Sequence, residues 1–132
     1  MTRAFELASK GKGATSPNPM VGAVIVKNGR IIAGGYHAHC GGDHAEVVVL
    51  KKAGDRARGA TLYVTLEPCA RYGRTPPCIK RIIESGTKKV VIGMKDPNPL
   101  MNGRSIQILR KSGIAVEVGV LENELRQLNE VF

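Results

Sequence analysis

The segment from Leu66 to Cys78 places two cysteines where their thiolates can converge on one centre. It follows a short run, Ala60–Thr65, whose β-branched and aromatic residues predict a strand. Pro68 has no N–H to donate to a sheet, so the strand ends there and Cys69 begins a loop. Cys78 follows two prolines, which suit the first turn of a helix but not its interior. A thiol at a helix N-terminus ionises more easily, and the thiolate is the form that binds metal.

A second helix start carries a histidine and a glutamate. The run Asp43–Leu50 predicts a helix that begins at Asp43 or His44 and ends at Gly54. Inside a helix, residues two apart point to different sides, so His44 and Glu46 can share a centre only where the first of them is not yet helical. The capping residue Asp43 just before them fits that position.

The rest of the chain alternates strands and helices. The dipeptide Asn28-Gly29 predicts a tight hairpin, because both turn positions favour φ > 0, and the strands on either side should be antiparallel. From the third strand onward, strands alternate with helices, which predicts parallel pairing. The expected strands are 21–27, 30–36, 60–65, 88–94 and 114–118, and the expected helices are 2–10, 43–53, 78–85, 103–113 and 121–132. The fold class is therefore α/β, a single domain over 1–132 whose five-stranded mixed sheet has helices on both faces.

The amino-acid composition limits the kinds of molecule that the chain can bind and the compartment in which it is expected. The 132-residue chain has a formal net charge of +9, which favours anionic partners such as RNA, DNA or a phosphorylated small molecule. Nucleic acid is disfavoured, because residues that stack on bases are scarce: no Trp, three Tyr and two Phe. No apolar run approaches the ~20 residues of a membrane span, so no membrane association is expected. Three cysteines do not suggest a disulfide scaffold, and a cytoplasmic location is expected.

One imidazole and two thiolates form a ligand set that suits Zn²⁺. Three protein ligands, His44, Cys69 and Cys78, with a water in the fourth position make the pattern of a catalytic rather than a structural zinc site. Two thiolates cancel the charge of the metal, so a base must help to deprotonate the water, and Glu46 is placed to be that base. The resulting hydroxide can attack an amino-bearing C=N carbon, after which ammonia leaves. His-x-Glu followed by Pro-Cys and a second Cys is the signature of zinc nucleobase deaminases.

The spacing of the two cysteines points to one family. Eight residues separate them, where the general signature has two. In this spacing the chain resembles the pyrimidine deaminases of riboflavin biosynthesis, the diaminohydroxyphosphoribosylaminopyrimidine deaminases. The resemblance covers nearly the whole chain, and the segments that carry it are 15–24, 42–47, 65–69, 72–78, 96–100 and 128–132.

The resemblance implies a cytidine-deaminase-like fold, a three-layer α/β/α sandwich. It also implies hydrolytic loss of an amino group from a phosphoribosylated diaminopyrimidinone, with Zn²⁺ as cofactor, and assembly into a homo-oligomer. Carried over by position, His44, Cys69 and Cys78 are the zinc ligands and Glu46 is the proton shuttle. The positions at which the family contacts its substrate are occupied by Asn18, His37 and Arg74.

The chain departs from the family in two respects. The family usually has Ser-His where this chain has Ala70-Arg71, which puts a permanent cation in place of an imidazole. In many members a reductase domain follows, and here the sequence stops where that domain would begin. A free-standing deaminase with a reductase partner, and the excised half of a bifunctional protein, are both open.

Two alternatives remain open at the level of sequence. Cys40, which lies beside His37 and His39, could close the zinc shell as a fourth ligand and make the chain a basic structural-zinc module that binds RNA. A nucleoside or tRNA deaminase acting on adenosine or cytidine would keep the same chemistry. Two features argue against that substrate class: the long loop between the two cysteines, and the presence of Arg74. Glu67 is expected to fix the loop through hydrogen bonds and not to act in catalysis.

Overall fold

The computed structural model describes residues 1–10, 20–37, 43–68, 78–95 and 103–120. The segments between and after these ranges lie outside the described residues. They include the predicted loops at 15–19 and 96–99, the whole loop between the two cysteines, and the predicted final helix 121–132.

The observed elements follow the expected ones to within a few residues. One 3₁₀ helix, η1, was not predicted. In chain order they are α1 (Thr2–Ser9), β1 (Gly22–Lys27), β2 (Arg30–Tyr36), α2 (Ala45–Ala53), η1 (Gly54–Ala57), β3 (Thr61–Leu66), α3 (Cys78–Ser85), β4 (Lys89–Met94), α4 (Arg104–Lys111) and β5 (Ala115–Val118).

The five strands form one mixed sheet in the order β2-β1-β3-β4-β5. The hairpin prediction is confirmed, because β1 and β2 pair antiparallel and the turn residues Asn28 and Gly29 have φ values of 52° and 75°. β1 also pairs antiparallel with β3, whereas β3, β4 and β5 are mutually parallel, as the alternation of strands and helices predicted.

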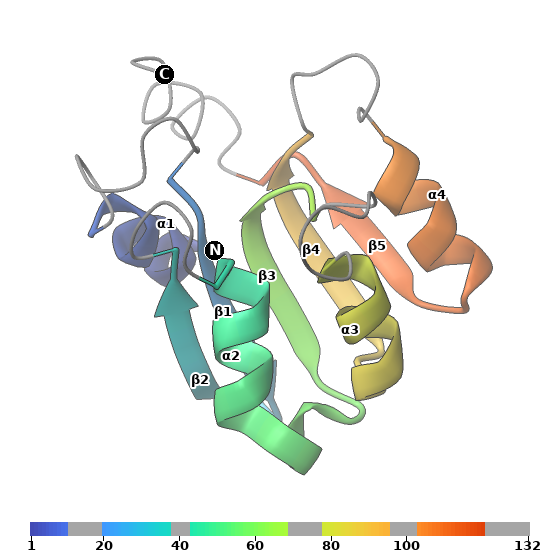
Figure 1. Cartoon of the computed structure of the whole chain (residues 1–132), viewed down its shortest axis with the longest axis horizontal. Coiled ribbons are helices and arrows are strands. Elements are labelled where there is room, and N and C mark those ends of the chain that lie inside the picture. Colours follow the sequence, from blue (N-terminus) through green and yellow to red (C-terminus); the bar gives the residue numbers. More distant parts are fainter. Residues whose placement is uncertain (11–19, 38–42, 69–77, 96–102, 121–132) are drawn as a thin grey trace.

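Helices cover both faces of this sheet (Figure 1). On one face, α2, α3 and α4 bury the main apolar cluster, to which Ala23 and Ile25 of β1 belong. Val24, between them, points the other way and packs with Ala4 and Leu7 of α1. The strand therefore supplies both inner surfaces of a three-layer arrangement, which confirms the predicted fold class. None of the helices in the described ranges has the length and apolar character needed to cross a membrane.

Gly22 lets α1 lie directly on the sheet. A Cβ atom at this position would overlap the carbonyl oxygen of Ala4 and approach the backbone nitrogen of Ala8 to 2.6 Å, and a helix backbone cannot move aside as a flexible side chain can. We expect Gly22→Ala to destabilise the fold by about 3 kcal/mol, at the upper end of overpacking costs. Chemical denaturation measures this loss.

Gly29→Ala is the matched control for this substitution. Its turn has φ of 75° and no atom within 4 Å of an added Cβ, so only backbone strain of about 1 kcal/mol applies. Equal losses in the two variants would contradict the close packing of α1 against Gly22.

The carboxyl ends of the parallel strands and the N-terminal ends of α2 and α3 meet at one edge of the sheet (Figure 1). β3 ends at Leu66, and the next backbone N–H, that of Glu67, donates to the carbonyl of Met94 at the end of β4 (2.9 Å). In open α/β sheets this edge is where ligands bind. Among the described residues singled out in the sequence, His44 and Cys78 stand at these two helix starts.

Candidate active site

His44 stands at the start of α2 without being part of the helix. Its φ and ψ of −67° and 158° are extended, and Ala45 is the first helical residue. The carbonyl of His44 accepts the N–H of Val48 and so closes the first turn. This is the geometry that the sequence required if His44 and Glu46 are to serve one centre, and this part of the prediction is confirmed.

The predicted capping role of Asp43 is wrong. His44 occupies the N-cap position, and no side chain caps the helix. The carboxylate of Asp43 instead accepts a hydrogen bond from Lys51 Nζ at 2.9 Å, which holds the pKa of Asp43 below its usual value. The chain turns into the helix one residue later than a cap at Asp43 would need, so the carboxylate reaches a cation on the following turns instead.

The structure brings His44 and Cys78 together. Cys78 is the first residue of α3, as predicted, and is 2% exposed; its Sγ lies 3.2 Å from Nδ1 of His44. A nitrogen and a sulfur that share one tetrahedral zinc, with bonds of about 2.0 and 2.3 Å, lie roughly 3.5 Å apart. Two donors from α2 and α3, which are 34 residues apart in sequence, therefore have a spacing that fits zinc.

His37 lies against this pair. It follows β2 and is 3% exposed, and its ring meets that of His44 edge to face with 5.4 Å between centroids. Its Nδ1 lies 3.1 Å from the carbonyl of Asp43, and because a carbonyl only accepts, Nδ1 carries the proton. In the neutral ring Nε2 is then an acceptor. The structure thus places His37 beside His44, and its role as a substrate contact remains a prediction.

Glu46 is a buried acid in the first turn of α2, with 4% of its surface exposed. Carboxylates are rarely buried to this degree, and buried acids are concentrated at functional sites. The N-terminal end of a helix also favours negative charge. Glu46 is therefore held in the environment that a proton-transfer group needs, two residues after the extended His44.

The other predicted site residues, Asn18, Cys69 and Arg74, lie outside the described residues, as do Cys40 and the pair Ala70-Arg71. Within the described part of the chain, no group of three His, Cys, Asp or Glu side chains gathers around a point that could hold a metal. The described ranges include two of the three predicted ligands, and the ligand set as a whole remains a prediction.

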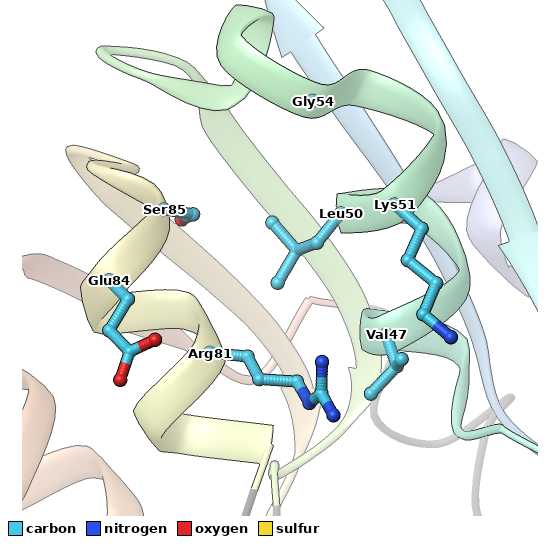
Figure 2. Close-up of a pocket in the computed structure, with 7 residues that line it drawn as sticks. All are labelled: Val47, Leu50, Lys51, Gly54, Arg81, Glu84 and Ser85. Atoms are coloured by element: carbon cyan, nitrogen blue, oxygen red, sulfur yellow. The ribbon is translucent and has the colours of Figure 1, made fainter.

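A groove between α2 and α3 does not include the site. It has a volume of about 260 Å³ and is lined by Val47, Leu50, Lys51, Gly54, Arg81, Glu84 and Ser85. Figure 2 shows Leu50 and Arg81 reaching into the space between the two helices. Of the predicted site residues that the structure describes, none of His37, His44, Glu46 and Cys78 lines it. We therefore place the chemistry at the helix starts and not in this groove.

Comparison with known proteins identifies the family. Residues 1–94 match the family described as "Cytidine and deoxycytidylate deaminase zinc-binding region". The chain belongs to this zinc-binding deaminase family. The diaminohydroxyphosphoribosylamino-pyrimidine deaminase of Buchnera aphidicola is 48% identical over the whole chain, which spans 90% of that protein. The chain is thus related to the pyrimidine deaminases of riboflavin biosynthesis, as the spacing of its cysteines indicated.

Other relatives are longer. The riboflavin biosynthesis protein RibD of Aquifex aeolicus is 58% identical over the whole chain, which spans 37% of that protein. A bifunctional deaminase/reductase from Thermotoga maritima has a solved structure that matches the whole chain with a TM-score of 0.94 and 55% identity, and the match covers 38% of it. For Acinetobacter baumannii RibD the TM-score is 0.95, at 51% identity over 99% of this chain and 37% of that one. The cytidine-deaminase-like fold is confirmed.

Proposed function

We propose that this chain deaminates diaminohydroxyphosphoribosylaminopyrimidine, releasing ammonia and 5-amino-6-(5-phosphoribosylamino)uracil. The observation that carries the proposal is the likeness to the Buchnera aphidicola enzyme of that name, which extends over nearly all of both chains. The contact between His44 and Cys78 supports it, because it supplies two zinc donors at the expected place. Family membership favours a deaminase over a structural zinc module that binds RNA.

His44, Cys69 and Cys78 would hold the Zn²⁺, which when bound supplies Lewis-acid activation of the attacking water. Glu46 takes a proton from that water and delivers it to the departing amine. Its burial keeps bulk water from competing for the proton, and it lies in the first turn of α2, two residues after the proposed ligand His44. Water adds to the amino-bearing carbon of the ring, and the C–N bond to the amine breaks.

Substrate contacts come from three positions. His37 is proposed to meet the pyrimidine, because its buried ring lies against that of His44 at the start of α2. Arg74 offers a rigid fork of N–H donors, which suits the phosphate or the polar ribose. Asn18 is proposed as a third contact.

Ammonia release over a panel of substrates tests the proposal. The panel is diaminohydroxyphosphoribosylaminopyrimidine, cytidine, deoxycytidylate and tRNA, each presented to zinc-loaded protein. We expect turnover of the first and little of the others. Turnover of tRNA or cytidine alone would overturn the substrate assignment but keep the deaminase chemistry.

The partners, the oligomeric state and the location of the protein are also proposed. The Thermotoga maritima relative is named as both a deaminase and a uracil reductase, which supports a reductase acting next on the product, either as a partner or in the same polypeptide. Residues 1–132 are proposed to fold as one catalytic domain that forms a homo-oligomer. The cytoplasmic location stays a prediction from the cysteine content.

A further inference from the structure

Glu67 is a second buried acid, and both oxygens of its carboxylate accept hydrogen bonds. It is 5% exposed and lies just after β3. Its Oε1 accepts the N–H of Gly103 at 3.0 Å, and its Oε2 accepts both the N–H and the hydroxyl of Ser105, at 3.2 and 2.8 Å. Hydrogen bonds from several donors to a buried carboxylate are among the strong ones in proteins.

These contacts join three elements at the edge of the sheet that carries the site. The backbone N–H of Glu67 is fixed on Met94 at the end of β4, while its side chain holds the first residues of α4. The N-cap of α4 is Gly103, in a left-handed conformation with φ of 76°, and the helix has no cap from its own side chains. Glu67 therefore supplies from β3 the acceptor and the negative charge that the N-terminus of α4 needs.

Glu67 is also close in sequence to a predicted zinc ligand. Cys69 follows it by two residues, and the residue between them is Pro68, whose ring fixes φ. Few backbone rotations separate the anchored residue from the thiolate. The backbone and the side chain of Glu67 are both fixed by hydrogen bonds only two residues before Cys69 in the sequence.

We propose that Glu67 is a positioning residue for the zinc, which keeps Cys69 aligned with His44 and Cys78 by tying the end of β3 to the start of α4. The inference rests on the proposed function, since it takes Cys69 as a ligand. A positioning residue and a simple helix cap differ in the effect of removing them. A cap that is removed weakens α4, whereas a lost positioning residue also loosens the metal.

The test is the rate at which zinc-loaded protein releases zinc to an excess of a colorimetric chelator. Glu67→Gln keeps the size of the side chain but turns an N–H₂ toward one of the three donors, so a buried donor is left unsatisfied. We expect release at least about ten-fold faster, the range seen when groups that orient metal ligands are lost. With Co²⁺ in place of zinc, the visible absorption bands of the metal should shift, since the thiolate geometry changes.

Two further variants separate positioning from stability. Ser105→Ala removes one of the three hydrogen bonds without adding a donor, and it should speed release by about two- to three-fold. Leu109→Ala creates a cavity under the same helix, where Leu109 is fully buried, and lowers the thermal midpoint without touching Glu67. Its zinc release should match that of the unsubstituted protein.

The inference is overturned if Glu67→Gln and Ser105→Ala release zinc at the unsubstituted rate, or if Leu109→Ala speeds release as much as Glu67→Gln. If the unsubstituted protein binds no zinc, the proposed function itself is contradicted. If the unsubstituted protein binds zinc and deaminates, and Glu67→Gln releases zinc at the same rate, only the role of Glu67 is contradicted.

Discussion

Glu46→Gln should abolish deamination almost completely while leaving zinc and fold in place. The amide has nearly the volume of the acid, so the buried site in the first turn of α2 can keep its packing. An amide cannot take a proton from water and pass it to an amine, and loss of a general acid–base group costs about 10²–10⁴ in rate. Steady-state ammonia release on metal-replete protein, with zinc content measured on the same sample, gives the result.

Glu84→Gln is the matched control. It makes the same chemical change on α3, where the carboxylate is exposed and lies 4.0 Å from Lys80. Exposed pairs of this kind contribute little to stability. Glu84 has no proposed role in binding zinc or substrate or in proton transfer, so turnover should be unchanged. If Glu46→Gln with full zinc keeps its kcat, the proton shuttle is another group.

The elements could be predicted because their signals are local. A proline after β3, two prolines before α3 and the Asn28-Gly29 turn each act on the backbone within a residue or two of themselves. The extended conformation of His44 also followed from a local argument, namely that two side chains spaced two residues apart in a helix cannot face one centre. Features of this range were confirmed almost to the residue.

Features that depend on distant partners could not be predicted in the same way. Nothing in the sequence near Asp43 shows that Lys51, two turns on, would take its carboxylate and leave the cap position to His44. Glu67 was expected to form hydrogen bonds, but its donors are 36 and 38 residues away and lie across β4. That neighbourhood depends on the pairing of β3 with β4, whose ends meet at Leu66 and Met94, and on the packing of α4 beside them, for which the sequence has no local signal.

The contact between His44 and Cys78 lies between these two cases. Each residue was placed at its helix start by local signals, but their distance of 3.2 Å depends on how α2 and α3 pack on the sheet. The ligand chemistry of zinc and the deaminase signature joined them into one predicted set, and the resemblance to a family agreed with it. The structure now adds an independent physical reason for that pairing.

Cys78→Ser should therefore remove zinc and with it all measurable turnover. A serine hydroxyl has almost the size of the thiol, so α3 can still form, but it stays protonated at neutral pH and gives the metal no thiolate. Loss of a ligand should weaken zinc binding by more than the 10–100-fold typical when only an orienting partner is lost. Metal analysis after dialysis and ammonia release on the same sample measure both effects.

Cys40→Ser makes the same chemical change at the cysteine that the rival structural-zinc interpretation requires. Under three-ligand coordination this variant keeps its zinc and its turnover, because the fourth position belongs to the attacking water. Zinc lost from both variants alike would mean a closed shell of four protein ligands. A closed shell leaves no place for water to be activated, so the hydrolase mechanism would fall with it, whereas zinc lost only from Cys78→Ser supports an open catalytic site.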